Sequence, residues 1–348
     1  MAQVAQQVSP VPKKKPWRIV VPAVALFLAA LVAGGLYYRS HRAKPLTDKD
    51  TIVLADFSNT TGDPVFEHAL KQALSIQLGR SPFLNVLSAL KVRETLTFMG
   101  RSPNDRVTDD AAREICERTG SSVTVSGSIT MLGSQYILGL SATNCHSGEI
   151  LAQEQVQCAR KEDVLSVLSQ ATTKIRAELG ESRSSIQKFD SPIAAVTTPS
   201  LEALNAFSLA VRTLEQKSEA EAIPLYKRAI ELDPNFALAY ASLGTAYANL
   251  EESDLARENY QKAYELRDRV SERERFLVIS NYYSDVTGEQ EKSIRTIQLW
   301  AQSYPRDATP HNYLGYEYVL QGFYDKAVPP RLFWSRGVPV SRPAAAAR

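Results

Sequence analysis

The longest uninterrupted apolar run lies near the N-terminus, from Ile19 to Tyr38 (IVVPAVALFLAALVAGGLYY), and it contains no charged residue. At about 1.5 Å per residue, a helix of this length spans about 30 Å, the thickness of the hydrocarbon core of a bilayer. We therefore expect a transmembrane helix at residues 19–38. A cleaved signal peptide is the alternative, but the apolar part of such peptides is only ~7–15 residues long.

Basic residues flank this run on both sides, four before it and three after it. The small excess on the N-terminal side favours a cytoplasmic N-terminus under the positive-inside rule. The predicted protein is thus a single-pass protein of the inner (plasma) membrane, with membrane lipid as the partner of Ile19–Tyr38. Residues 1–18 would form a short basic cytoplasmic segment, and the body of the chain would be extracytoplasmic.

Residues 45–181 alternate between short apolar runs and amphipathic stretches, the pattern of a mixed α/β domain. The expected order of elements is β-α-β-α-α-β-β-β-α. A two-residue loop, Gly133-Ser134, predicts a hairpin that pairs Met131 with Tyr136, Ile129 with Leu138 and Val125 with Ala142. Strands are expected at 51–57, 83–87, 123–131, 136–142 and 150–158, and helices at 65–78, 90–99, 109–118 and 161–179.

A self-similarity with a period of 34 residues follows a predicted linker at 182–199. Ala222, Tyr226 and Ala229 recur as Ala256, Tyr260 and Ala263. This spacing resembles the tetratricopeptide repeat, and an ordinary amphipathic bundle is the alternative. The residues that match the packing positions of that repeat are Leu243, Gly244, Tyr247, Ala256, Tyr260 and Ala263, with Leu314 and Gly315 in a later copy.

The resemblance implies antiparallel helix pairs stacked into an α-solenoid, about 3.5 repeats long within residues 200–328. It also implies a groove that holds a protein or peptide partner. The third copy follows a three-residue insertion, and the fourth stops at Pro329-Pro330. We expect residues 329–348 to be an aberrant basic tail, either a frameshifted gene end or a short basic binding segment.

Charge is distributed unevenly along the chain, whose formal net charge is +2. Residues 1–44 contain seven basic residues and no acid, and residues 329–348 contain four basic residues and no acid, which leaves residues 45–328 with a charge of −9. Because an acidic body repels phosphates, we expect no nucleic-acid partner. Three cysteines are too few for a disulfide scaffold, and Cys145 and Cys158 are expected on opposite sides of the sheet.

One candidate ligand loop stands out, because Asp56 lies at the end of the first predicted strand and Asn59 and Asp63 follow it. Open α/β sheets bind ligands at such strand ends, although ordinary turn and helix-capping chemistry explains the same residues. Phosphate-binding, kinase and metalloprotease motifs are absent from the sequence. We therefore predict no catalytic, cofactor-binding or metal-binding residues and no enzymatic activity, with a site near Asp56 as the alternative.

The succession of anchor, α/β domain and repeats also resembles the extracytoplasmic half of bacterial receptor-type serine/threonine kinases and of membrane-bound winged-helix regulators. The α/β part is similar to the N-terminal domain of the translocation protein TolB. The resemblance implies a membrane-anchored scaffold or sensor in signal transduction, with a kinase or regulator as a candidate partner. The alternative is the sensor fragment of a receptor kinase whose catalytic domain is missing from this chain. The expected fold class is α+β.

Overall fold

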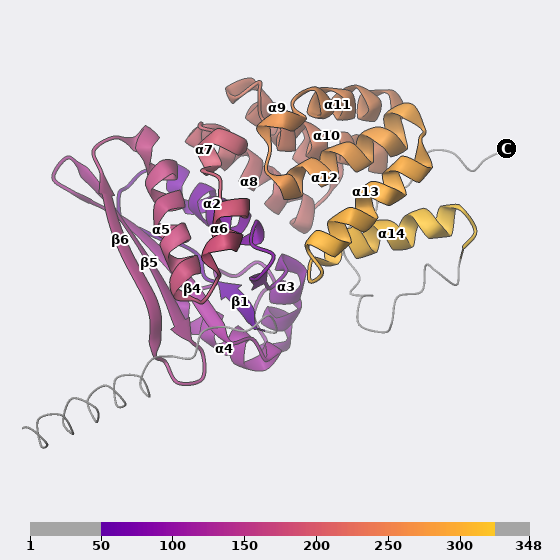
Figure 1. The fold of residues 1–348 in the computed structure, drawn as a ribbon. Coiled ribbons are helices and arrows are strands. Elements are labelled where there is room, and N and C mark those ends of the chain that lie inside the picture. The colour runs from indigo at the N-terminus through magenta and orange to yellow at the C-terminus, as the bar shows by residue number, and fades with distance from the viewer. Residues whose placement is uncertain (1–49, 324–348) are drawn as a thin grey trace, which may run out of the picture. The chain divides into compact units, whose positions relative to one another are not determined.

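The computed structural model describes residues 50–323, which form a mixed α/β part followed by a helical part (Figure 1). The strands of the sheet are β1 (Thr51–Leu54), β2 (Ser58–Asn59), β3 (Asn85–Val86), β4 (Val123–Leu132), β5 (Gln135–Asn144) and β6 (Ile150–Cys158). They follow the order β3-β1-β4-β5-β6, with the short β2 beside β4. β1 runs parallel to both β3 and β4, whereas β4, β5 and β6 are antiparallel.

The predicted hairpin is confirmed. Met131 pairs with Tyr136, Ile129 with Leu138 and Val125 with Ala142, with Gly133-Ser134 as the loop. β1 is shorter than the strand expected at 51–57, and β2 follows it as a separate short strand. Phe57 is fully buried although it lies outside the strand. Its ring occupies the space over Gly127 of β4, where any side chain would collide with it.

Helices cover both faces of this sheet. On one face lie α2 (Val65–Gly79) and α5 (Val164–Glu178), whose apolar residues join the main core with those of β4 and β5. On the other face lie α3 (Ala89–Phe98) and α4 (Asp109–Thr119), which enclose a smaller core with Val53 and Ala55. Thr108 caps the N-terminus of α4, since its side chain accepts a hydrogen bond from the Ala111 amide.

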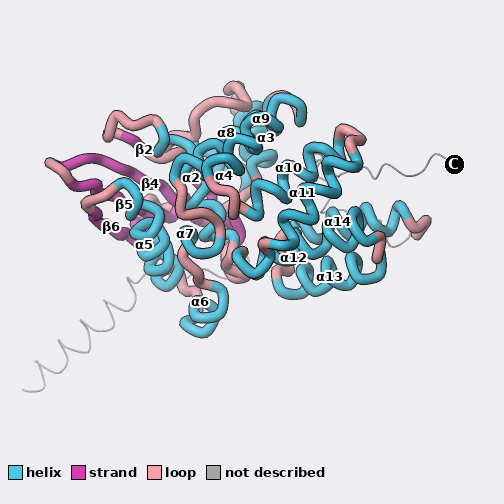
Figure 2. The backbone as a smooth tube through the Cα atoms, turned by 90° about the horizontal axis from the view of Figure 1, so that it is seen from above, coloured by secondary structure: helices cyan, strands magenta, loops and turns pink. Residues whose placement is uncertain are grey.

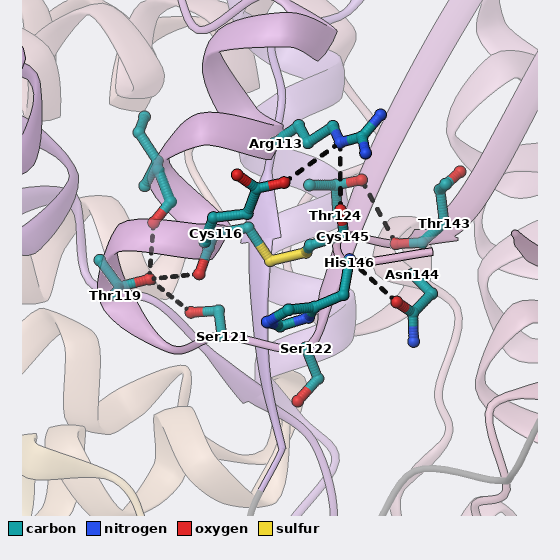
Figure 3. The surroundings of a disulfide bond; sticks show 12 residues. Arg113, Cys116, Thr119, Ser121, Ser122, Thr124, Thr143, Asn144, Cys145 and His146 are labelled. Atoms are coloured by element: carbon teal, nitrogen blue, oxygen red, sulfur yellow. Dashed lines mark hydrogen bonds and ion pairs between the residues drawn. A yellow bond between two sulfur atoms is a disulfide. The ribbon is translucent and has the colours of Figure 1, made fainter. Parts of the chain in front are cut away.

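A disulfide bond joins Cys116 of α4 to Cys145, which directly follows β5 (Figure 3). The two Cα atoms are 6.1 Å apart, and both side chains are buried in the smaller core. Arg113 lies beside the bond, where its Nε donates to the carbonyl oxygen of Cys145 at 3.1 Å. Cys158 packs against the main core on the other face, so the predicted separation of Cys145 and Cys158 is confirmed. The pairing of Cys116 with Cys145 was not predicted.

The segment expected as a linker contains two short helices, α6 (Arg183–Phe189) and α7 (Ile193–Val196). This correction has a physical reason, because the segment supplies core contacts: Ile193 is fully buried in the main core. Arg80, at the end of α2, is buried beneath it and donates to the carbonyl oxygen of Ser191 at 2.6 Å and to Oγ1 of Thr197 at 2.6 Å.

The helical part consists of successive antiparallel helices (Figure 2). The first pair is α8 (Leu201–Gln216) with α9 (Glu219–Leu232), and the second is α10 (Ala237–Asn249) with α11 (Ser253–Glu265). The third is α12 (Glu272–Asn281), which continues as a π-helical segment (Tyr282–Thr287), with α13 (Gln290–Ser303). The last described helix is α14 (Ala308–Leu320). The part of the predicted fold class that is confirmed is a mixed α/β region followed by a helical region.

The predicted localisation as a single-pass membrane protein is corrected. No helix within residues 50–323 has both the length and the apolar character needed to cross a membrane. The run Ile19–Tyr38, on which that prediction depended, lies outside the described residues, as does the predicted tail at 329–348.

Candidate functional site

Six of the eight residues predicted to pack the repeats lie on α10 and α11. Gly244 lies against the ring of Tyr260, and a Cβ atom added to Gly244 would lie 2.8 Å from two carbons of that ring. Tyr260 is buried, and its hydroxyl donates to Oγ1 of Thr245 at 3.1 Å. Leu243, Tyr247, Ala256 and Ala263 are also buried, whereas Leu314 and Gly315 lie half-buried on α14.

Substitution of Gly244 by Leu is expected to lower the free energy of unfolding by about 1–3 kcal/mol, because the larger side chain overpacks the contact with Tyr260. Denaturant unfolding measures this loss. Ser242→Leu, a half-buried position on the same helix, is the matched control and should change the stability less. An unchanged midpoint for Gly244→Leu would show that α10 and α11 do not pair in this way.

A cluster of half-buried aromatic side chains lies where the second helix pair meets the third. The rings of Tyr264 and Tyr282 are stacked with centroids 3.7 Å apart, and the ring of Tyr283 lies 5.9 Å from that of Tyr282. Two cations border these rings: the guanidinium of Arg267 is 4.2 Å from the Tyr264 centroid, and Nζ of Lys292 is 5.4 Å from that of Tyr283. We call these five residues the tyrosine surface.

The tyrosine surface has the composition of a protein-binding surface. Tyrosine and arginine are enriched among the residues that dominate binding energy at protein interfaces. Sequence reasoning did not find this surface, although it had a signal. The Tyr282-Tyr283 pair opens the π-helical segment, in the repeat that carries the three-residue insertion, and π-helical turns occur frequently at functional sites.

Two carboxyl groups lie close to this junction, on the π-helical segment and on α14. Burial raises the pKa of Asp285 to about 6 and the pKa of Glu317 to about 7, because the charged form loses its hydration. Oγ of Ser284 donates to Oε1 of Glu317 at 3.2 Å and partly offsets this effect. Glu317 is therefore close to half-ionised at neutral pH.

We expect Glu317→Gln to stabilise the protein at pH 8 by about 1–3 kcal/mol and to leave its stability unchanged at pH 4. The unfolded chain ionises Glu317 near its ordinary pKa of 4.5, and the folded chain does so only near 7. The wild type therefore loses stability as the pH rises from about 4.5 to 7, and glutamine removes this loss. Urea unfolding at both pH values measures the difference, and an equal effect at pH 4 and pH 8 would contradict it.

The three residues of the candidate ligand loop occupy different environments. Asp56 follows β1 and lines a cavity at the end of that strand. Asn59 holds the following turn, since its Nδ2 donates to the carbonyl oxygen of Asp63 at 2.8 Å. Asp63 accepts from the Val65 amide at the start of α2 and pairs with Lys161 at 2.8 Å, which also binds Glu202 of α8 at 2.9 Å. The structure thus separates Asp56 from the other two, and a ligand role for the loop remains a prediction.

Comparison with known proteins identifies one repeat. A family model described as TPR repeat, the tetratricopeptide repeat, matches residues 214–251, from the end of α8 through α10. The chain therefore contains a tetratricopeptide repeat, of the kind that mediates protein–protein interaction, as predicted. This match does not show the predicted resemblance to receptor-type kinases. No curated protein sequence matches the chain.

Several solved structures are similar to parts of the chain. The C-terminal domain of LpoB from Salmonella enterica is 16% identical with a TM-score of 0.31, and the match covers 35% of this chain and 92% of that one. TolB from Acinetobacter baumannii is 13% identical (TM-score 0.27; 39% and 30% covered), and a MamA protein is 19% identical (TM-score 0.25; 48% and 80% covered). TM-scores of this size do not establish a common fold.

Proposed function

We propose that the helix pairs between residues 201 and 303 form a scaffold that binds a protein or peptide partner through the tyrosine surface. The observation that carries this proposal is the tetratricopeptide repeat at 214–251, because such repeats stack into extended surfaces that bind other proteins. The half-buried rings and the two cations supply the anchoring side chains that such a surface needs.

The first helix pair supports this choice of surface, because part of it is already covered. Oγ of Ser208 on α8 donates to the carbonyl oxygen of His68 on α2 at 3.2 Å, and Arg212 contacts the imidazole of the same residue. This face of α8 is therefore packed against the α/β part. A partner that bound this face of α8 would have to displace α2, whereas a partner on the tyrosine surface would not.

Affinity capture with the full chain tests the proposal. Arg267→Glu combined with Lys292→Glu should reduce retention of a captured protein by about tenfold or more, since both cations border the aromatic rings. The matched control is Arg160→Glu combined with Lys174→Glu, which changes the same charges at exposed ion pairs of the α/β part. Equal retention by the wild type and both variants, or loss in the control alone, would refute the proposal.

A further inference from the structure

A cavity of about 310 Å³ lies at the carboxyl ends of β1 and β3. The chain passes from β1 to β3 on one side and then returns to β4 on the other side of β1, so the direction of the connections changes at β1. Open α/β sheets bind ligands outside the carboxyl ends of the strands at such a switch point. Buried apolar side chains line the cavity, among them Leu54, Leu96 and Val107.

The walls of this cavity come from both parts of the described chain. α2 and α3 contribute on the side of the sheet, and α8 contributes from the first helix pair. The hydrogen bond from Ser208 to the carbonyl oxygen of His68 holds α8 against α2 at this point. A molecule in the cavity would therefore contact the sheet domain and the repeat region together.

Four acidic and four basic side chains line the cavity, so charge of both signs surrounds it. Both carboxylate oxygens of Asp56 are occupied, because Oδ1 accepts from Nζ of Lys71 at 2.5 Å and Oδ2 accepts from the Val107 amide at 2.7 Å. Glu67, Asp105 and Glu215 also line the cavity, and their side chains are exposed, as are those of Arg106 and Arg212. The positive charges of Arg93, Lys71 and Arg212 act on the carboxyl group of Glu215. Asp56 thus serves to position Lys71 and the loop before α4.

Three arginines, Arg93, Arg106 and Arg212, line the same cavity. Arg93 donates one N–H group to the carbonyl oxygen of Glu215, and Arg106 donates one to that of Phe57. Arg212 lies 3.0 Å from Nδ1 of His68. Burial and the charge of Arg212 lower the pKa of His68, so its imidazole is neutral at pH 7 and can accept this bond. Because each guanidinium carries five N–H donors, the hydrogen bonds described here use a minority of them.

We propose that this cavity binds a small organic anion, with its carboxylate or phosphate group held by Arg93, Arg106 and Arg212 and its apolar part against Leu54, Leu96 and Val107. Arginine matches both kinds of oxyanion, because its planar fork donates two parallel hydrogen bonds. The volume is at the lower end of the ~300–1,000 Å³ range of small-molecule sites, which limits the ligand to a compact molecule.

Thermal unfolding and calorimetric titration of the full chain with three aromatic probes test this proposal. Phenyl phosphate and benzoate carry the two oxyanions on the same ring, and benzamide is the uncharged control; sodium chloride matches the ionic strength. At least one anion should raise the melting temperature, because a ligand that binds only the folded state stabilises it. A response to phenyl phosphate alone assigns a phosphate ligand, and a response to benzoate alone assigns a carboxylate.

Arg212→Gln should weaken the binding of the effective anion by about tenfold or more, since it removes charged hydrogen bonds. Arg228→Gln is the matched control, because Arg228 is exposed on α9 and pairs only with a neighbour on the same helix at 3.0 Å, Glu231, among the interactions described. The control should bind as the wild type does. No stabilisation beyond that of benzamide, or equal binding by Arg212→Gln and the wild type, would overturn the proposal.

Discussion

Substitution of Arg176 by Ala is expected to lower the free energy of unfolding by about 3–5 kcal/mol, because it leaves a carboxylate buried without its partner. Arg176 and Glu181 are both fully buried, and Nε and Nη2 of the arginine donate to the two carboxylate oxygens at 2.8 and 2.9 Å. Nη1 also donates to Oδ1 of Asp190 at 3.0 Å. The network fixes the end of α5 to the segment that leads into the helical part.

Arg160→Ala is the matched control for this prediction. Arg160 forms the same type of ion pair with Asp163 at 2.7 Å, but its side chain is 71% exposed. Exposed ion pairs contribute only about 0–1 kcal/mol, so this variant should unfold nearly as the wild type does. Urea unfolding of both variants at pH 7 gives the comparison. Similar losses in the two variants would mean that Arg176 is not buried as described.

Removal of the disulfide by Cys116→Ser is expected to lower the free energy of unfolding by about 3–4 kcal/mol. The reason is that the disulfide restricts the unfolded chain, and the variant regains the conformational entropy of the loop between the two cysteines. Cys116 and Cys145 are separated by 29 residues. Unfolding in guanidinium chloride, with and without a reducing agent, measures the effect. The reductant should destabilise the wild type and have no effect on the variant.

Cys158→Ser serves as the control for the disulfide, because Cys158 is a free cysteine packed on the opposite face of the sheet. This variant should keep the full sensitivity of the wild type to reductant. If the wild type does not respond to reductant, or if Cys158→Ser abolishes the response, then the pairing of Cys116 with Cys145 is wrong.

The features that could be predicted from the sequence are those that neighbouring residues determine. The β4–β5 hairpin was predictable down to its residue pairs, because Gly133-Ser134 sets the loop and the period of two sets the register. The contact of Gly244 with the next helix followed in the same way from the fixed offset of the repeat. In both cases the contacting residue is close in the sequence, because it lies in the next strand or the next helix.

The features that sequence reasoning missed depend on contacts between distant segments. Nothing in the spacing of three cysteines indicates that α4 brings Cys116 beside Cys145. The helices at 183–196 form because Ile193 reaches the main core, which no local pattern reveals. Asp56 was predictable as a strand-end residue, but its cavity was not, because Arg212 reaches it from a helix about 150 residues farther along the chain.

Hydrogen exchange of the full chain, measured alone and with a protein retained by affinity capture, tests the central claim most directly. If the helix pairs bind the partner, amide protection should increase in α11, in the π-helical segment and at the start of α13, where the tyrosine surface lies. The sheet strands β4 to β6 should keep the exchange rates of the free protein. Protection confined to β4–β6 and α5, with none on the helix pairs, would contradict the account.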